Sequence, residues 1–243
     1  MLRRTGTLAG ARYAFTDRHG GTSAAPYDGL NLGDHVQDDP HAVADNRRLL
    51  AAALELDPSR LAFMRQVHAA EVAVLDSPPA PNDTPPTADA LVTRLPDLAL
   101  VVLVADCVPV LLAARRSDVI AVAHAGRRGV AAGIVPATVA AMSAQGARPD
   151  RMAAVVGPAI CADCYEVPAE LADQVSAVEP ATRATARSGR PALDLRAGVV
   201  AQLVAAGVQA VEVDPWCTAE SADLYSHRRD GVTGRFAGVL VRD

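Results

Sequence analysis

The chain has 243 residues, of which 50% are hydrophobic and 21% are charged, and its formal net charge is −5. This composition is typical of a globular protein and excludes a disordered one. The arginine pairs are scattered rather than clustered, so the sequence offers no basic surface for nucleic acid. The longest apolar run, 98–105, is too short to cross a bilayer, and the N-terminus lacks a signal-peptide pattern. We therefore expect a cytoplasmic protein with no membrane partner.

The predicted elements follow one another without a strict strand–helix alternation. Valine-rich apolar runs bounded by Asp, Gly or Pro predict buried strands at 61–67, 71–75, 98–104, 108–113, 119–123, 152–156, 208–213 and 236–241. Helical patterns cover 38–54, 130–145, 168–178 and 195–206. Asp39 and Pro40 are typical of the start of the first helix. Residues 77–87 are proline-rich and predict a surface loop, and 179–191 form a second loose stretch. This order favours a mixed sheet.

Three reactive side chains come where predicted strands end. His68 follows the run 61–67, Cys107 follows 98–104, and His124 closes the run that begins at 119. Ligand sites in α/β folds form at such sheet edges. Three ligands from separate strands are what a catalytic zinc site needs, because the fourth position stays open. The same donors suit copper. The alternative is two hydrogen-bonded histidines and a buried cysteine that behaves as a small hydrophobe.

Residues beside these candidates have two interpretations each. Gly126 and Gly129 follow His124 and precede a helical pattern, so their backbone N–H groups could approach an anion. They could equally form an ordinary strand-to-helix turn. Asp106, adjacent to Cys107, is a candidate proton carrier or a structural hydrogen-bond acceptor.

The remaining candidates lie in loops. Arg228 and Arg229 follow His227 in YSHRRDG, and adjacent guanidinium groups can bind phosphate or serve as plain surface charge. Cys161 and Cys164 have knuckle or redox spacing but no matching second pair, so we predict free thiols that catalysis does not need. Four cysteines in a chain of this length make no disulfide framework. Three further histidines lie in polar segments and should be exposed: His19, His35 and His41.

The chain resembles the laccase-domain (polyphenol oxidase) family, and the resemblance covers nearly all of it. The matching blocks are 15–50, QVH at 66–68, ADALVT at 88–93, ADCVPVLL at 105–112, AVAHAGRRG at 121–129, GPAI at 157–160, YEV at 165–167, 194–208 and 225–241. The resemblance implies one α/β domain over 1–243, with mixed β-sheets layered between helices. It places the zinc ligands at His68, Cys107 and His124. Arg127 departs from the family pattern, which has Trp at that position.

The resemblance also implies an activity. Members are known as purine nucleoside phosphorylases with adenosine deaminase activity, and a related member is the peptidoglycan editing factor. We therefore expect a zinc enzyme that cleaves adenosine, inosine or methylthioadenosine with phosphate and also deaminates adenosine. Its partners would be these nucleosides and phosphate. Arg228, Arg229 and, less directly, Arg18 are the candidate phosphate-binding residues.

Three other hypotheses stay open. A copper-dependent polyphenol oxidase is disfavoured, because the chain has six histidines and no His-x-His pair, whereas a multicopper relay needs several such pairs. A cysteine hydrolase acting on a peptidoglycan precursor would use Cys107 as its nucleophile, and zinc bound to that thiolate would block it. A non-catalytic binding protein would not need a convergent His and Cys set.

Overall fold

The computed structural model describes residues 1–80 and 83–243; residues 81 and 82, inside the predicted loop 77–87, lie outside the described residues. The strands are β1 (Leu2–Leu8), β2 (Ala11–Thr16), β3 (Leu61–Ala62), β4 (Val72–Leu75), β5 (Ala90–Thr93), β6 (Ala99–Val104), β7 (Val108–Ala114), β8 (Ile120–Ala125), β9 (Met152–Val156), β10 (Arg183–Thr185), β11 (Pro191–Leu193), β12 (Ala210–Val213) and β13 (Phe236–Val241). The α-helices are α1 (Pro40–Ala53), α2 (Arg127–Ala132), α3 (Ile134–Ala144), α4 (Ala169–Val178), α5 (Leu195–Ala205) and α6 (His227–Asp230).

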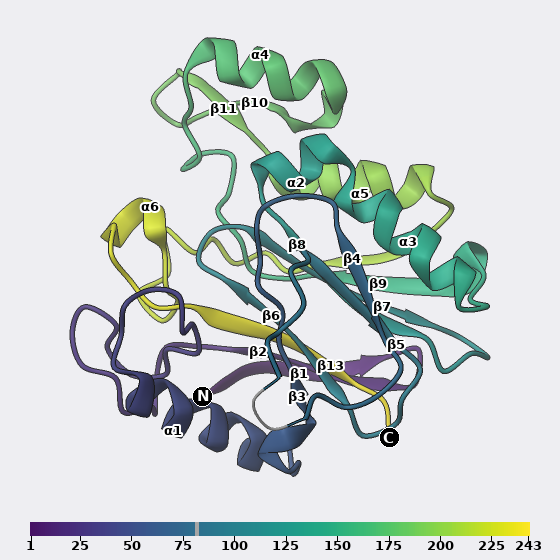
Figure 1. The fold of residues 1–243 in the computed structure, drawn as a ribbon. Helices are drawn as coiled ribbons and strands as arrows, with labels where there is room; N and C mark the ends of the chain where they lie inside the picture. The colour runs from purple at the N-terminus through teal and green to yellow at the C-terminus, as the bar shows by residue number, and fades with distance from the viewer. Residues whose placement is uncertain (81–82) are drawn as a thin grey trace.

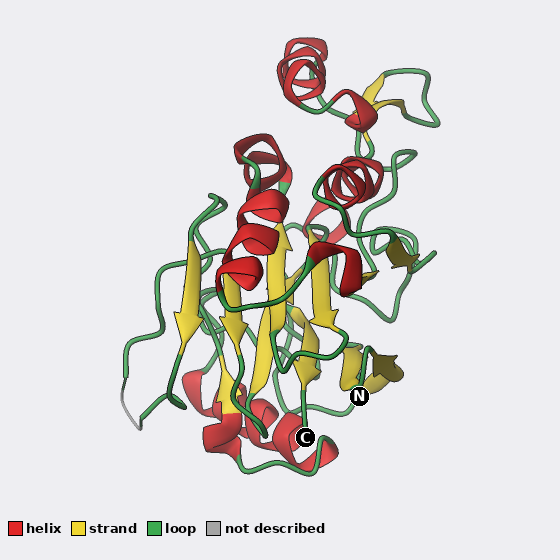
Figure 2. Ribbon diagram, turned by 90° about the vertical axis from the view of Figure 1, so that its right-hand side faces the viewer, coloured by secondary structure: helices red, strands yellow, loops and turns green. Residues whose placement is uncertain are grey.

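Two mixed sheets stack face to face between helices. Across the described residues, one sheet has the order β1-β2-β13-β6-β3 and the other β12-β9-β7-β8-β5-β4. Helix α1 covers the outer face of the first sheet, and α2, α3 and α5 cover the outer face of the second (Figures 1 and 2). Helix α4 and the ribbon β10–β11 stand beyond α5. The expected fold class, an α/β protein with mixed sheets layered between helices, is confirmed.

Side chains alternate between the layers as the two-residue period of a strand requires. On β6, Leu100 and Val102 enter the core between the two sheets, whereas Val101 and Leu103 enter the core beneath α1. The fully apolar strand runs of the sequence thus come from strands that are buried on both faces. The apolar residues within these runs pack in the core, so the polar residues that end the runs are the candidates for catalysis or metal binding.

Most predicted elements lie where the sequence placed them. Helix α1 begins at Pro40, and the Asp39 carboxylate accepts a hydrogen bond from the backbone N–H of His41, as an N-cap does. Among the described residues, no helix combines the length and the apolar character needed to cross a membrane. The predicted surface exposure of His19, His35 and His41 is confirmed.

Two predicted elements differ from the structure, and several elements were not predicted, among them the N-terminal hairpin, β5, β10 and β11. The helix expected over 130–145 is broken at Gly133, whose φ of +82° ends α2 before α3 begins. The strand expected over 61–67 stops at Ala62, because the side-chain amide of Gln66 takes over pairing with the backbone of Leu103. The N-terminal hairpin was missed, since β1 is a polar edge strand without an apolar run.

Candidate metal centre

The three sequence-predicted ligands come together from three separate segments. Cys107 lies in the short link between β6 and β7, which carries the chain from one sheet to the other. His124 is the next-to-last residue of β8. His68 lies in the loop between β3 and β4, with a left-handed φ of +61°, so it does not directly end a strand as expected. Asp106, before Cys107, also has a positive φ, +94°. The segments that carry His68 and Cys107 therefore both contain a tight backbone turn, which sets the direction of the ligand side chain.

The donor atoms are spaced as a metal ion requires. One ligand atom from each of His68, Cys107 and His124 lies within 4.8 Å of the other two. The Cys107 Sγ is 3.9 Å from His68 Nε2, and the two imidazole rings meet edge to face with their centres 4.7 Å apart. A tetrahedral zinc ion with bonds of about 2.3 Å to sulfur and about 2.0 Å to nitrogen holds those two atoms about 3.5 Å apart. The donors thus fit zinc with little movement.

Gly126 keeps the space between the ligands open. A Cβ atom at this position would lie 2.9 Å from His68 Cδ2 and 3.0 Å from Cys107 Sγ. Its φ of −77° is one that any residue adopts, so only the lack of a side chain is needed here. Gly126 is also the N-cap of α2, which links the ligand cluster to the start of that helix. The sequence makes Gly126 a candidate backbone N–H donor to an anion. The structure adds a second role, because the missing side chain of Gly126 leaves room for His68 and Cys107.

Asp89 organises two of the three ligands and was missed in the sequence. The fully buried carboxylate accepts a 2.8 Å hydrogen bond from His124 Nδ1, which directs His124 Nε2 toward the cluster. It also accepts hydrogen bonds from the backbone N–H groups of Val67, His68 and Ala69. Burial opposes its ionisation, but these hydrogen bonds hold the pKa of Asp89 below its usual range. A carboxylate behind a ligating imidazole fixes its tautomer and raises its basicity.

Charge within the cluster favours a thiolate. Burial opposes ionisation of Cys107, yet the neighbouring His124 and His68 outweigh it and lower the pKa of Cys107 to about 6. Burial likewise opposes the charge on His124, but Cys107 and Asp89 raise the pKa of His124 to about 9. In the metal-free protein the three groups therefore form an alternating carboxylate, imidazolium and thiolate row. A thiolate is the form that binds a metal or acts as a nucleophile.

The cluster opens into a cavity of about 400 Å³, which is within the size range of small-molecule sites. The side chains around its walls combine aliphatic, aromatic and polar groups: His35, Gln66, Leu103, Val104, Ala105, Asp106, Ile160, Tyr165, Leu195, His227, Arg228 and Arg235. The walls come from both sheets and from the loops after β9 and before β13. This arrangement can hold a flat, polar molecule against the three donors.

Two guanidinium groups line this cavity, and neither forms a salt bridge with a carboxylate of the described residues. Arg228 donates to the carbonyl of Glu166 at 2.7 Å and lies over the ring of Tyr165, 5.0 Å from its centre. Arg235 donates to the carbonyls of Thr233 and Gly234, and burial lowers its pKa. Because their hydrogen-bond acceptors are neutral, both cations can still gain from binding an anion.

The other two predicted arginines lie elsewhere. Among the described residues, the cavity lining excludes both Arg229 and Arg18. The Arg18 guanidinium lies 4.8 Å from the centre of the Tyr225 ring and 3.5 Å from the Asp28 carboxylate. Arg229 pairs with Asp230 at 2.7 Å and donates to three backbone carbonyls, those of Thr218, Ser221 and Leu224. These contacts stabilise the loop before α6.

Asp106 lines the cavity with both carboxylate oxygens already engaged. One accepts a 2.6 Å hydrogen bond from the hydroxyl of Thr218, and the other accepts a 2.6 Å hydrogen bond from the backbone N–H of Arg228. It therefore ties the ligand link to the segment that carries Arg228. This geometry favours the structural interpretation of Asp106.

Sequence signals existed for the residues that were missed. Asp89 lies in ADALVT, Tyr165 in YEV and Arg235 in the final matching block. Each is a polar residue within a block already singled out, but its contacts come from segments distant in the chain. Asp89, for example, reaches His124 across 35 residues.

Comparison with known proteins decides the family. The family model described as "Multi-copper polyphenol oxidoreductase laccase" matches residues 12–243. The chain belongs to this laccase-like family. The family's name refers to copper chemistry, and the three donors of this member form a candidate site for a single metal ion.

Similar members carry a different description. A purine nucleoside phosphorylase of Streptomyces coelicolor is 54% identical over 244 residues, which is 100% of both chains. Another, of Corynebacterium glutamicum, is 48% identical over 94% of this chain and 93% of its own. Both names support the conclusion that this chain is an enzyme.

Solved structures agree with the family assignment. YlmD from Geobacillus stearothermophilus has a TM-score of 0.88 and 34% identity, covering 97% of this chain and 93% of its own. The Neisseria meningitidis protein NMB0706 has a TM-score of 0.86 and 35% identity, covering 99% and 98%. This laccase-like member therefore shares the fold of those proteins over nearly its full length.

Proposed function

We propose that this laccase-like protein is a zinc-dependent purine nucleoside enzyme that cleaves adenosine, inosine or methylthioadenosine with phosphate and also deaminates adenosine. The observation that carries the proposal is one cavity that brings together the His68, Cys107 and His124 donor set and the side chains of two arginines, Arg228 and Arg235. The names of the similar Streptomyces and Corynebacterium proteins support the phosphorolytic part. We further infer that the protein works in the cytoplasm, where free thiols persist.

The three donors would hold the metal, with His124 positioned by Asp89. Zinc in such a site supplies Lewis acidity, the property that activates water or polarises a leaving group at neutral pH. Copper would fit the same donors, but zinc agrees better with a three-ligand site that leaves one position open.

In phosphorolysis the chain's own task is to hold two reactants together. Arg228 and Arg235 would bind the phosphate dianion, whose oxygen attacks the ribose carbon C1′ as the bond from C1′ to the purine nitrogen breaks. The products are the sugar 1-phosphate, which is ribose 1-phosphate from adenosine or inosine and its 5-methylthio derivative from methylthioadenosine, and the purine base, which takes up a proton as it leaves. Tyr165 and Ile160 in the cavity wall offer the apolar contact that a purine ring needs.

Deamination needs water and a proton carrier instead of phosphate. Water oxygen adds to the purine carbon C6, ammonia leaves, and a proton moves from the water to the departing nitrogen. His227 lines the cavity and donates from Nδ1 to the carbonyl of Gly231 at 2.7 Å, a contact that fixes the orientation of the ring. Imidazole is the side chain best suited to general acid–base catalysis. We assign the proton transfer to His227 in preference to Asp106, whose oxygens are both engaged.

A second candidate function rests on a specific observation. Asp89, His124 and Cys107 form a carboxylate–imidazole–thiolate row, which is also the arrangement of a cysteine hydrolase. A metal-free enzyme could use Cys107 to attack an acyl group of a cell-wall precursor. Zinc bound to Cys107 would abolish that activity, so the metal content of the active protein distinguishes the two functions.

The test incubates zinc-loaded, copper-free protein with adenosine, with and without phosphate, and separates the products by chromatography. We expect adenine and ribose 1-phosphate only with phosphate, and inosine in both cases. Arg228→Ala should raise the KM for phosphate about tenfold or more, the loss of one charge-assisted contact. Arg148→Ala, at an exposed arginine paired with Asp150, is the control and should change nothing.

Two outcomes contradict the proposed function, and a third contradicts the assignment of Arg228 to the anion site. Oxidation of a phenol without nucleoside turnover would favour the oxidase. Turnover of an acyl substrate by metal-free protein would favour the hydrolase. A phosphate KM that Arg228→Ala leaves unchanged would remove Arg228 from the anion site, and Arg229→Ala would then test the neighbouring arginine, which the sequence also predicted.

A further inference from the structure

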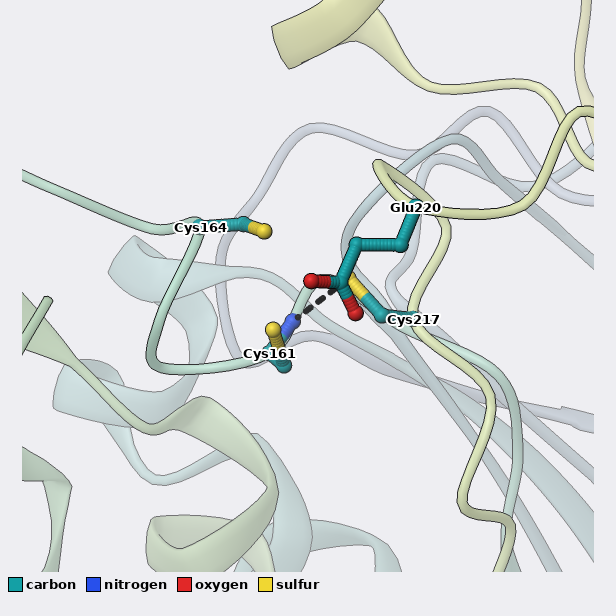
Figure 3. A group of neighbouring side chains, drawn as sticks. All are labelled: Cys161, Cys164, Cys217 and Glu220. Carbon is teal, nitrogen blue, oxygen red and sulfur yellow. Dashed lines mark hydrogen bonds between the residues drawn. The ribbon is translucent and has the colours of Figure 1, made fainter. Parts of the chain in front are cut away.

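Three thiols and one carboxylate gather outside the cavity lining. Cys161 and Cys164 lie in the loop after β9, and Cys217 and Glu220 lie between β12 and α6 (Figure 3). One ligand atom from each of the four lies within 4.8 Å of the other three. We propose that this cluster is a second metal site, in which zinc is held by three thiolates and one carboxylate and has a structural role.

The donor set and spacing match a closed zinc site. Two cysteines separated by two residues form the usual knuckle, and four protein ligands with no open position are typical of structural zinc. Thiolate ligands favour zinc over magnesium or calcium. In a tetrahedral site with zinc–sulfur bonds of about 2.3 Å, neighbouring sulfur atoms lie about 3.8 Å apart. The present separations therefore need only small side-chain adjustments.

The backbone already prepares these thiols as ligands. The N–H of Cys161 donates to the Sγ of Cys217 at 3.3 Å, the contact drawn in Figure 3. Hydrogen bonds to a ligating sulfur hold its orientation and stabilise its negative charge. The N–H groups of Cys164 and Tyr165 both donate to the carbonyl of Cys161, which folds the CADC segment into a turn. The Cys217 thiol is buried and hydrogen-bonded, so its position is the most constrained of the cluster.

A nearby cation offsets part of the charge. Three thiolates and a carboxylate around a zinc dication leave a net charge of −2. The Arg187 guanidinium lies 2.6 Å from the Glu220 carboxylate and 3.5 Å from that of Asp163. A carboxylate that keeps one oxygen on arginine can give the other to the metal.

The location assigns the site its role. Cys161 and Cys164 precede Tyr165, and Cys217 and Glu220 precede Arg228, so a metal would join the two loops that form one wall of the cavity. The contacts between those loops include an isolated β-bridge between Ala159 and Cys217, the Cys161 hydrogen bond to the Cys217 sulfur and the Arg228 contact with Glu166. The proposed metal would position this wall without touching the substrate, which agrees with the prediction that catalysis does not need these thiols directly.

The test counts metal in the protein purified without chelator. The sequence predicts one zinc per chain, whereas two sites require two equivalents by elemental analysis. We expect one equivalent in Cys107→Ala and one in the Cys161→Ser, Cys164→Ser double variant, which leaves the buried Cys217 in place. Asp163→Asn is the matched control, since Asp163 lies between the two cysteines but contributes no ligand atom, and it should keep two equivalents.

Cobalt gives a second readout that does not depend on activity. Metal-free Cys107→Ala protein titrated with Co²⁺ should develop thiolate-to-cobalt charge-transfer bands and the strong visible absorption of tetrahedral cobalt. Adding the two serine substitutions should abolish both. A weaker visible band in Cys107→Ala, Glu220→Gln would confirm the carboxylate ligand.

The outcomes separate the two sites. If wild type holds one zinc and the double serine variant retains it, the cluster is not a metal site. If the metal-loaded wild type contains a disulfide among Cys161, Cys164 and Cys217, the proposal is likewise overturned. If Cys107→Ala keeps as many equivalents as wild type while the double serine variant loses one, the cluster stands and the donor set in the cavity fails.

Discussion

At the scale of single residues, one buried carboxylate, that of Asp89, fixes the positions of two residues of the candidate metal centre. Asp89 accepts hydrogen bonds from the loop that carries His68 and from the imidazole of His124. Its four acceptor contacts offset the cost of burying a charge, which would otherwise favour the protonated acid. Loss of that charge would therefore disturb two ligands together.

The same charges give the cavity thiol a distinctive pH dependence. With a pKa of about 6 instead of 9.0, Cys107 is a thiolate at neutral pH in metal-free protein. Because only the thiolate is alkylated, its reaction rate with iodoacetamide should be half-maximal near pH 6 and level above pH 7. Burial raises the pKa of Cys161 and Cys164, so these thiols should stay slow over that range. Peptide mass spectrometry resolves the three rates.

Asp89→Asn provides the control for this titration. Without the carboxylate, His124 loses a cause of its raised pKa, and the midpoint for Cys107 should move upward. A wild-type midpoint near the ordinary value of 9.0 would show that the imidazoles do not act on the thiol as the geometry indicates.

At the scale of elements, ligand placement depends on how short connections end. The β6–β7 link and the start of α2 bring Cys107 and Gly126 together because β7 and β8 are antiparallel neighbours. The N-cap of α2 is Gly126, which must lack a side chain because a Cβ would press on two ligands. The start of this helix is therefore also part of the site.

Gly126→Ala should weaken zinc binding more than about tenfold, or about 1.4 kcal/mol, while the fold persists. Alanine adopts the backbone conformation without strain, but its Cβ would press on His68 and Cys107 at 2.9–3.0 Å. Competition with a chromogenic chelator measures the affinity. Gly133→Ala is the control, because its φ of +82° makes alanine strained far from the ligands. It should lower the unfolding temperature and leave zinc affinity intact; equal affinity losses in both variants would contradict the steric explanation.

The sequence predicted the elements that obey local rules and missed those that depend on distant partners. Strands such as β6 and β7 are buried on both faces, so their apolar runs are unbroken and easy to recognise. The β1–β2 hairpin turns at Ala9 and Gly10, both with positive φ, but β1 is polar and at an edge, so no apolar run marks it.

The candidate site shows the same division. Residue type and position after predicted strands made His68, Cys107 and His124 candidate ligands, and the family resemblance implied their assignment to a metal. Arg229 and Arg235 are the same residue type in the same block, and only their contacts tell a loop-stabilising arginine from one that faces the cavity. Sequence alone holds no information on which carbonyls each would meet.

At the scale of the whole molecule, the two sheets must keep their spacing for the cavity to keep its shape. Phe15 from the first sheet is fully buried against Gly157, which follows β9 of the second sheet and begins the loop that carries Tyr165. The apolar core between the sheets thus reaches the segment that forms the cavity wall. Packing at this point links stability to the geometry of the site.

Gly157→Ala should destabilise the protein by about 1–3 kcal/mol, the usual cost of overpacking a core. The new Cβ would lie 2.2 Å from Phe15 Cε1 and 2.8 Å from Pro109 Cγ, so the sheets or the ring must move. Phe15→Leu alone should also destabilise, because it leaves a cavity. The double variant should be more stable than the sum of the two losses predicts, by about 0.5 kcal/mol or more, since the smaller side chain makes room for the methyl group. Urea unfolding of the four proteins in this cycle measures that coupling. Strictly additive losses would show that Phe15 does not set the spacing at Gly157, and the clash with Pro109 within the second sheet would then be the cause of the instability.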